Sequence, residues 1–461
     1  MIRSTHAGAG AVFLVLAELA LAAPAALAGP RSVPPIAITN FTLGNGLEFI
    51  VHEDHSTPVV AVVVYYDVGA AHDPPGRRGF AHLFEHLLFQ ETEHIKRGDL
   101  KRLIEGSGGF YNGATVDDST LYLDVLPSNR LNLALWVEAE RMARLRVTDG
   151  NVQREREVVN EEHRMRRANQ PYGKSYETLN TLATDYPPYD RVSTMADLDA
   201  ATAADVYDFY KQYYNPNSAT VIVAGNTSEA EVRKLAEQYF GGLPRGPDVA
   251  PLPPPTPTPR TSGERRATLT DELAVAPRLD VAYNIPPRRH EDTNALWLLS
   301  TLLGQGESSR LYRRLVAEEQ VTSQASSLFD SKYGPGLLMF RLLPMQGIAL
   351  ARLEQLLEEE IGKLQAGDLT PRELEKAKNQ LLADRVITDH MTDGRQTVLS
   401  KALWLQDAHL MYGDAGAVNT TLDKLLAVTA EDILRVARTY LLPANRTVLA
   451  TVPGKPAAGE K

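Results

Sequence analysis

Two histidines and a glutamate stand close together in the segment His82-Leu83-Phe84-Glu85-His86. On a helix, His82 and His86 lie one turn apart on the same face, where both imidazoles can reach a single metal ion. Glu85 projects from that face beside the ion, whereas Phe84 falls on the opposite side, as a core-facing residue should. The order His-x-x-Glu-His is the inverse of the commoner zincin arrangement and is typical of one group of metallopeptidases. The segment therefore predicts a zinc site that could hydrolyse peptide bonds.

A third metal ligand has to come from elsewhere, because catalytic zinc usually takes three protein ligands and leaves one position for water. The glutamate-rich stretch 155–162 supplies candidates. Glu155 and Glu162 share a helix face, so one carboxylate could bind zinc while the other steadies a histidine. Spacing alone does not choose between Glu161 and Glu162. Acidic runs are usually solvated helix faces, and a helical His pair can be a surface feature; the coincidence of both patterns in one chain favours the metal site.

The elements that would position these residues follow one another without regular strand–helix alternation. The periodicity predicts helices over residues 79–89, 99–106, 132–143 and 152–167. Apolar runs rich in β-branched and aromatic residues predict strands over residues 47–51, 59–66 and 119–125. Only residues 52–58 separate the first two strands, which favours an early hairpin. The mixed order favours the α+β class.

Two parts of the chain look like copies of one another. Thr202-Ala203-Ala204-Asp205-Val206 matches Thr429-Ala430-Glu431-Asp432-Ile433 at an offset of 227 positions, and the same offset relates Pro216 to Pro443. Each copy predicts a helix with an N-cap Thr, a Pro turn, and an apolar strand, over residues 219–224 and 447–452. Two long copies indicate an internal duplication rather than a repeat array.

The clearest boundary in the chain is a proline-rich stretch. Six prolines fall between Pro251 and Pro259, a density that excludes helix and sheet interiors and favours a semi-rigid linker. We therefore expect a zinc-bearing N-terminal domain over residues 36–243, a linker over residues 244–266, and a homologous C-terminal domain over residues 267–457.

The N-terminus reads as a secretory signal peptide. Arg3 precedes an apolar stretch over residues 11–23, and Ala26-Leu27-Ala28 supplies the small residues that a signal peptidase requires. We expect cleavage after Ala28, so that residues 1–28 are removed; a membrane anchor or a buried helix is the alternative. No other segment is apolar enough to span a membrane. The expected location is the periplasm.

Composition narrows the chemistry and the partners. The 461 residues carry a formal net charge of −10 and no Lys/Arg cluster of the kind that follows phosphates, so nucleic acid is not an expected partner. The chain has no cysteine, which excludes disulfides, a cysteine nucleophile and cysteine-ligated zinc. A disulfide-free exported protein is compatible with a bacterial periplasm.

With these motifs the sequence resembles the pitrilysin-type (M16) metallopeptidases, in particular short bacterial forms akin to the mitochondrial processing peptidase. The resemblance runs over nearly the whole mature chain and includes the stretches 79–89, 110–113, 155–162, 171–173, 213–217 and 304–311. It implies two homologous α+β halves that close as a clamshell around a central chamber, with a peptide or unfolded polypeptide as substrate.

The resemblance also implies roles for single residues. His82, His86 and Glu162 would bind one Zn2+ per chain, with Glu85 as the general base. Glu155 would be the supporting carboxylate behind a histidine. Asn112 would help to hold the substrate backbone near the scissile bond.

One part of the family pattern is missing from the second half. Self-sufficient members carry an Arg and, seven residues later, a Tyr, but the corresponding positions here are Val316 and Ser323. A local gap could hide the pair elsewhere. Our hypothesis is instead that this chain is the metal-bearing subunit of a heteromeric peptidase, with a homologous partner subunit supplying the Arg and Tyr. The alternative from another class is a non-catalytic structural or assembly subunit of the same fold.

Overall fold

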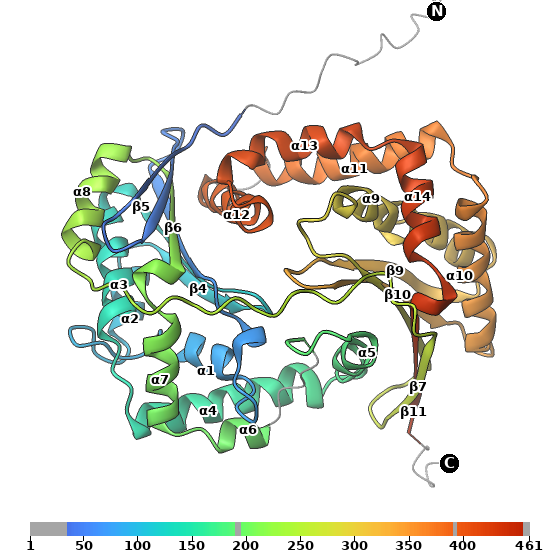
Figure 1. Ribbon diagram of the computed structural model, residues 1–461, viewed down its shortest axis with the longest axis horizontal. Coiled ribbons are helices and arrows are strands. Elements are labelled where there is room, and N and C mark those ends of the chain that lie inside the picture. Colours follow the sequence, from blue (N-terminus) through green and yellow to red (C-terminus); the bar gives the residue numbers. More distant parts are fainter. Residues whose placement is uncertain (1–34, 190–194, 391–393, 455–461) are drawn as a thin grey trace, which may run out of the picture. The chain divides into compact units, whose positions relative to one another are not determined.

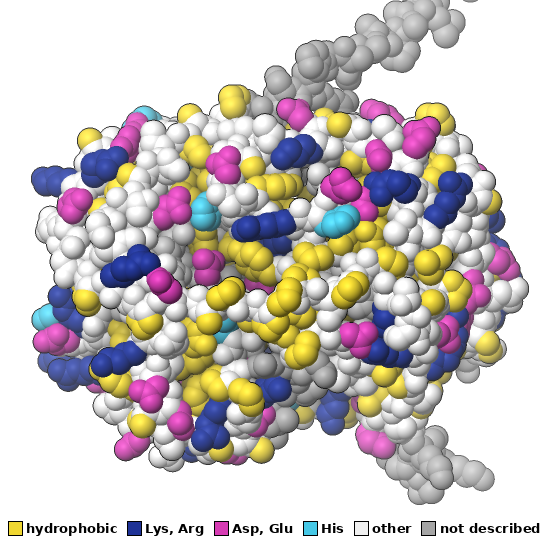
Figure 2. Space-filling view, in the orientation of Figure 1, with side chains coloured by type: hydrophobic (Ala, Val, Ile, Leu, Met, Phe, Trp, Pro, Cys, Tyr) yellow, Lys and Arg dark blue, Asp and Glu magenta, His cyan; other side chains and the backbone are white. Residues whose placement is uncertain are grey.

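The computed structural model describes residues 35–189, 195–390 and 394–454. The predicted signal peptide, residues 1–28, lies outside these residues. From Ile36 onward the chain belongs to one compact unit. None of the described helices is long and apolar enough to cross a bilayer. On the face shown in Figure 2, Lys and Arg side chains are interspersed with Asp and Glu side chains.

The first half is built on a mixed sheet of six strands. Their order is β1-β2-β6-β3-β5-β4, and only the β2–β6 pair is parallel. The strands are β1 (Thr39–Thr42), β2 (Glu48–Glu53), β3 (Val59–Tyr66), β4 (Phe110–Thr115), β5 (Thr120–Pro127) and β6 (Ala219–Gly225). The strands predicted from apolar runs are thus present, and β4 lies at an edge of the sheet.

The predicted hairpin between the first two apolar strands is wrong. β2 and β3 do not pair, because β6 lies between them, parallel to β2 and antiparallel to β3. The short loop at residues 54–58 therefore spans the width of one strand. The hairpin that does form joins β1 to β2. Since β6 follows β3 by some 150 residues of chain, nothing local in the sequence indicates that it inserts there.

Most helices of the first half pack over one face of this sheet (Figure 1). The four helices predicted from periodicity form within a few residues of the expected bounds. The helical segments are η1 (Ala70–His72), α1 (Phe80–Leu87), α2 (Asp99–Glu105), η2 (Ser128–Arg130), α3 (Leu131–Arg144), α4 (Asp149–His163), η3 (Arg164–Ala168), α5 (Ser175–Ala183), α6 (Met195–Asp199), α7 (Ala203–Tyr213), η4 (Pro216–Ser218) and α8 (Glu229–Phe240). The η3 segment is a π-helical turn that directly continues α4.

The second half repeats this plan with a five-stranded sheet, ordered β7-β11-β8-β10-β9. Its strands are β7 (Arg265–Asp271), β8 (Arg278–Ile285), β9 (Thr322–Asp330), β10 (Gly336–Pro344) and β11 (Arg446–Pro453). Its helical segments are α9 (Thr293–Gly304), η5 (Tyr312–Glu318), α10 (Leu350–Gln365), α11 (Pro371–His390), α12 (Gly394–Tyr412), η6 (Ala415–Ala417), α13 (Val418–Ala427), α14 (Ala430–Tyr440) and η7 (Pro443–Asn445).

The duplication predicted from the 227-residue offset is visible in strand register. Thr220 of β6 lies opposite Glu48 of the parallel β2, and Thr447 of β11 lies opposite Arg265 of the parallel β7. The two N-cap threonines also behave alike: Thr202 and Thr429 each form a capping box with an Asp three residues later. The domain boundaries remain a prediction, although β7 already includes the last two residues of the expected linker.

Each half also packs one helix against the sheet of the other half. Leu179 and Ala183 of α5 lie in a cluster with Ala282 and Leu449 of the second sheet. Conversely, α12 packs against β3 and β6 of the first sheet, with its apolar residues in a common cluster. An offset of 227 moves α5 onto residues 402–410, which lie within α12. The exchange is therefore reciprocal and follows from the duplication.

Candidate metal centre

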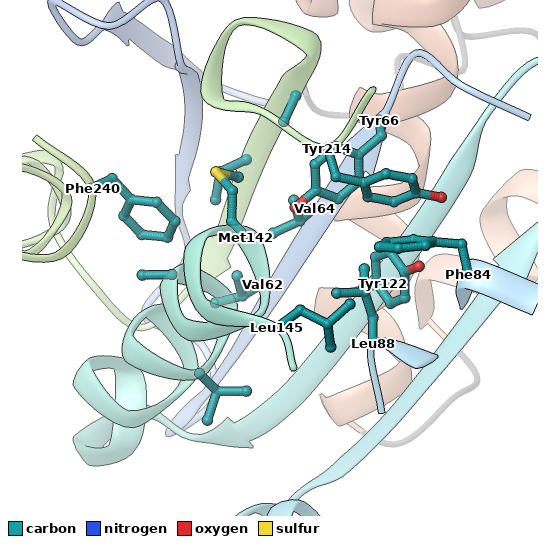
Figure 3. Packing of buried hydrophobic residues seen from close by; sticks show 14 of the residues in the cluster. Val62, Val64, Tyr66, Phe84, Leu88, Tyr122, Met142, Leu145, Tyr214 and Phe240 are labelled. Atoms are coloured by element: carbon teal, nitrogen blue, oxygen red, sulfur yellow. The ribbon is translucent and has the colours of Figure 1, made fainter. Parts of the chain in front are cut away.

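Helix α1 carries the first two candidate ligands on one face and core residues on the other. Leu83, Phe84 and Leu87 are no more than 1% exposed. The ring of Phe84 lies 4.0 Å from that of Tyr214 between centroids, within the aromatic cluster seen in Figure 3. Because this packing fixes the rotation of the helix about its axis, His82 and the residues beside it must face away from the core.

The start of α1 is held by a carboxylate from outside the helix. Gly79 precedes it in a left-handed conformation, with a φ of 87°, which favours glycine. The backbone N–H groups of Gly79 and Ala81 donate to the two carboxylate oxygens of Asp73, at 2.6 and 2.9 Å. Asp73 therefore satisfies helix-end donors in place of an N-cap side chain.

The three candidate ligands converge. Oε2 of Glu162 in α4 lies 3.9 Å from Nε2 of His82 and 3.2 Å from Nε2 of His86. One ligand atom from each residue lies within 4.8 Å of the other two. Bond lengths of about 2.0–2.2 Å around a tetrahedral zinc ion place ligand atoms roughly 3.3 Å apart. The donor set and its spacing therefore fit zinc, with a fourth position left for water.

Burial distinguishes Glu162 from Glu161, the two candidates for the third ligand between which sequence spacing does not choose. The Glu162 side chain is 20% exposed, and its Oε1 is held by Nη1 of Arg166 at 2.6 Å, which leaves Oε2 for the histidines. The Glu161 side chain is 56% exposed and pairs with Arg164 at 2.8 Å. Neighbouring residues on a helix point about 100° apart, so only one of the two can face α1. The geometry favours Glu162.

Glu155 lies behind the second histidine. Its Oε2 is 3.7 Å from Nδ1 of His86, while Nε2 of the same ring faces Glu162. Glu155 is buried, at 5% exposure. A carboxylate on the far nitrogen of a metal-binding imidazole fixes the tautomer and the ring orientation. The role of Glu155 as the supporting carboxylate stays a prediction.

The two imidazoles differ in their electrostatic surroundings. Burial and the neighbouring His86 lower the pKa of His82 to about 4, so its ring is neutral near pH 7. Burial also acts to lower the pKa of His86, but Glu155 and the other carboxylates outweigh it and raise that pKa. Neutral imidazole is the form that binds metals.

Glu85 lies beside the cluster without being part of it. It is 8% exposed, and burial raises the pKa of its carboxyl, although the hydrogen bond from Thr115 and the charge of His86 act to lower it. Oγ1 of Thr115 donates to its Oε2 at 2.7 Å. A β-carbon on Gly113 would lie 3.1 Å from its Oε1 and 2.9 Å from the Phe89 ring. Thr115 and Gly113 thus shape the site, and sequence reasoning assigned neither a role.

Asn112 lies on the same strand but makes no contact that defines a role. It is exposed, and its Oδ1 accepts a hydrogen bond from the backbone N–H of Gly113 at 2.9 Å. Its strand, β4, pairs only with β5 among the described strands, so one edge of β4 is unpaired within the sheet. The substrate contact expected of Asn112 stays a prediction.

In the second half, the two positions that were expected to correspond to the Arg–Tyr pair are Val316 and Ser323. Val316 lies in the π-helical segment η5 and is partly buried against the second core. Ser323 is exposed on β9, where its hydroxyl donates to the carbonyl of Leu343 at 3.4 Å. Neither side chain carries charge or a phenol.

Comparison with known proteins gives the family. The model described as Insulinase (Peptidase family M16) matches residues 48–182, and the model described as Peptidase M16 inactive domain matches residues 200–381. The chain therefore belongs to the M16 peptidase family, as the resemblance predicted.

Relatives of this chain are similar over most of their length. The zinc protease PqqE of Helicobacter pylori is 29% identical, over 89% of this chain and 92% of that protein. A probable mitochondrial-processing peptidase subunit beta of Arabidopsis thaliana is 25% identical, over 92% of this chain and 79% of that protein. A solved protease structure from H. pylori has a TM-score of 0.83 and 28% identity, covering 91% of this chain and all of that one. The predicted α+β fold with two homologous halves, which M16 structures arrange as a clamshell, is confirmed.

Proposed function

We propose that this chain is a zinc-dependent endopeptidase that hydrolyses peptides or unfolded polypeptides, with Glu85 as the general base. The observation that carries the proposal is the convergence of His82, His86 and Glu162 from two helices, within 4.8 Å of one another and beside Glu85. Membership of a family whose relatives are named zinc proteases supports it.

The donor atoms have separate tasks. Nε2 of each histidine and Oε2 of Glu162 would hold one Zn2+ per chain, and Glu155 would keep the His86 ring in the orientation that presents Nε2. When bound, zinc supplies a Lewis acid for the peptide carbonyl and lowers the pKa of a water to about 7.

Glu85 moves the proton. Its Oε2 is engaged by Thr115, so Oε1 is the oxygen that would accept a proton from the attacking water and return it to the leaving amine.

Substrate would lie along β4. A strand with an unpaired edge can add an extended peptide through main-chain hydrogen bonds, and Thr115 of β4 reaches Glu85. Since only an extended chain can pair in this way, unfolded polypeptides are favoured over folded proteins. In this arrangement Asn112 would contact the substrate backbone.

We further propose that the chain acts as the catalytic subunit of a heteromeric complex in the periplasm. Its second half has Val316 and Ser323 where a self-sufficient enzyme would need Arg and Tyr, so a homologous partner subunit would supply that pair. Export would follow from removal of residues 1–28. Hydrolysis of unstructured peptides by the purified chain at the rate of the partnered enzyme would refute the heteromeric part alone.

The catalytic part is tested by metal content and peptide hydrolysis of the mature chain, with its partner subunit present. We expect about one zinc per chain, retained in Glu85→Gln but lost in Glu162→Gln. Both variants should be inactive. Glu161→Gln is the matched control, since the exposed Glu161 pairs only with Arg164, and it should keep both zinc and activity.

The alternative function is a non-catalytic assembly subunit of the same fold. It would be favoured over the peptidase if the purified protein held no stoichiometric zinc and Glu85→Gln changed no peptide assay. The complete set of His82, Glu85, His86 and Glu162 in one cluster supports the peptidase instead.

A further inference from the structure

The side chain of Thr115 reaches the carboxylate of Glu85 from the strand that lies beside α1. Its Oγ1 donates to Oε2 of Glu85 at 2.7 Å, the usual length of a bond between a hydroxyl and an oxygen acceptor. We infer that Thr115 is a positioning residue for the peptidase reaction: it holds one carboxylate oxygen of Glu85 so that the other points at the reacting water. This inference rests on the proposed function of Glu85.

The Thr115 hydroxyl has a second neighbour, the hydroxyl of Thr120, but the Glu85 carboxylate is the nearer acceptor. Thr120 is fully buried, and its hydroxyl donates to the carbonyl of Val68 at 2.8 Å. Its proton is therefore committed, and the 3.5 Å contact between the two threonine hydroxyls is the weaker one for Thr115. A hydroxyl has one proton to give, so the proton of Thr115 goes to Glu85.

The turn that directly follows Thr115 is held in place by contacts from both halves of the molecule. The N–H groups of Ala70 and Ala71 donate to the carbonyls of Val116 and Asp117 at 3.0 and 2.8 Å. From the second half, Nζ of Lys332 lies 2.8 Å from Oδ2 of Asp117. Because the turn is held by both halves, the Thr115 hydroxyl has little freedom to leave Glu85.

The same strand leaves space for the other carboxylate oxygen. Gly113, two residues before Thr115, faces Oε1 of Glu85, and even a β-carbon there would lie only 3.1 Å away. Strand β4 therefore contacts the two oxygens differently: the Thr115 hydroxyl donates to Oε2, and glycine at position 113 keeps a side chain away from Oε1. This asymmetry is what a base needs in order to present a single oxygen to water.

A merely structural role for Thr115 makes different predictions. Threonine is favoured in strands because its branched side chain packs well on a pleated surface. Valine would keep that shape without the hydroxyl, and serine would keep the hydroxyl without the methyl group. The two variants therefore separate positioning from packing.

The test compares Thr115→Val and Thr115→Ser with the wild type in the partnered, zinc-loaded enzyme. For Thr115→Val we expect kcat to fall roughly 10- to 100-fold, as for loss of a hydrogen bond to a charged group, with KM and zinc content unchanged. For Thr115→Ser we expect kcat within about threefold of the wild type. Thr268→Val, on the exposed edge strand β7, is the matched control and should behave as the wild type.

Each outcome decides the inference. Unchanged kcat in Thr115→Val, an equal loss in the Val and Ser variants, or loss of zinc from Thr115→Val would each overturn it. Failure of the proposed function looks different, because the wild type would then lack zinc or Glu85→Gln would be as active as the wild type.

Discussion

The two halves share a sheet, but only one carries the metal centre. The strands β2, β6, β3, β5 and β4 of the first half are matched in order and direction by β7, β11, β8, β10 and β9 of the second. In each half a helix follows the third of these strands in the same place. In the first half that helix is α1, with His82, Glu85 and His86; in the second it is α9, which contains no His, Asp or Glu.

The difference between the two helices is one of burial as well as chemistry. Ten of the twelve residues of α9 are buried, including Leu298, Leu299 and Leu302, whereas α1 leaves one face partly open for its histidines. A helix enclosed on all sides can be apolar throughout, but it cannot present ligands to substrate. The second copy therefore has the same scaffold without the metal-binding residues.

A second difference lies at the opposite edge of the sheets. In the first half Phe49 and Val51 of β2 are buried, and the ring of Phe49 packs against Phe240 of α8. The described residues include no strand or helix after β11 to match α8, and the register places the exposed Arg266 and Thr268 at the two β2 positions. The second half thus keeps the strand pairing although it has no counterpart of α8 among the described residues. Backbone hydrogen bonds between strands do not depend on which side chains face water.

Metal removal is the strongest test of this asymmetry. A chelator should abolish peptide hydrolysis and lower the stability of the first half, because an ion that binds only the folded state stabilises it by mass action. Hydrogen exchange should quicken in α1 and α4 but not in α9 and α10. Equal changes in both halves would contradict the comparison, and zinc addition should restore the original exchange pattern.

Loss of the carboxylate behind His86 should have the next largest effect. Glu155→Gln should weaken zinc binding or activity by roughly 10- to 100-fold, since removing such a partner frees the imidazole to rotate. Glu157→Gln on the exposed side of the same helix is the matched control and should bind zinc normally. Zinc titration by competition with a chromophoric chelator measures both; equal affinities would mean that Glu155 does not orient the ring.

Several features of the two halves could be predicted from the sequence because they depend on short spacings between residues. The ligand pair in α1 follows from the periodicity of one helix, and the duplication follows from matching threonines, prolines and strands at one offset. The N-cap threonines, Thr202 and Thr429, were visible for the same reason. Each of these signals can be recognised within a short continuous segment of chain.

Other parts depend on contacts between distant segments. The insertion of β6 between β2 and β3 and the exchange of α5 and α12 bring together residues far apart in sequence, which no local pattern records. Glu161 and Glu162 have the same type, and only the packing of α4 on α1 decides which one faces the histidines. The roles of Thr115 and Gly113 likewise become visible only when β4 is placed beside α1.

The ion pairs that Lys332 forms across the two halves should contribute less than the metal site, but more to the free energy of unfolding than an ion pair on the surface. Lys332 is buried, with its Nζ 2.8 Å from Asp117 of the first half and 3.2 Å from Asp330 of the second. Lys332→Met should lower the free energy of unfolding by about 3 kcal/mol, because it leaves two carboxylates without their cation. Lys101→Met, whose exposed pair with Glu105 spans 3.8 Å, should cost less than about 0.5 kcal/mol.

Urea unfolding measures both lysine variants. A single transition in the wild type that splits into two in Lys332→Met would show that this contact couples the halves. Equal stability of the two variants would mean that the Lys332 contact contributes no more than a surface pair.

The smallest expected effect on stability concerns a feature that the two halves share, the capping box at one helix N-terminus. Thr202 and Thr429 cap α7 and α14 with the same capping box, so Thr→Ala at either position should lower the free energy of unfolding by about 1 kcal/mol. Hydrogen bonds from the threonines lower the pKa of Asp205 and of Asp432. A lowered pKa means that each Asp stabilises the fold above its ordinary pKa of about 4 and loses this contribution as pH falls below it.

The cost of each Thr→Ala change should therefore shrink as the pH is lowered from 7 towards 3.5, and by a similar amount in the two variants. Thermal unfolding at a series of pH values checks this. A cost confined to one variant would show that the two helices no longer depend on their caps alike, because the packing of one of them outweighs its N-terminal hydrogen bonds. The duplication would then persist in backbone geometry but not in the energetics of its most similar segment.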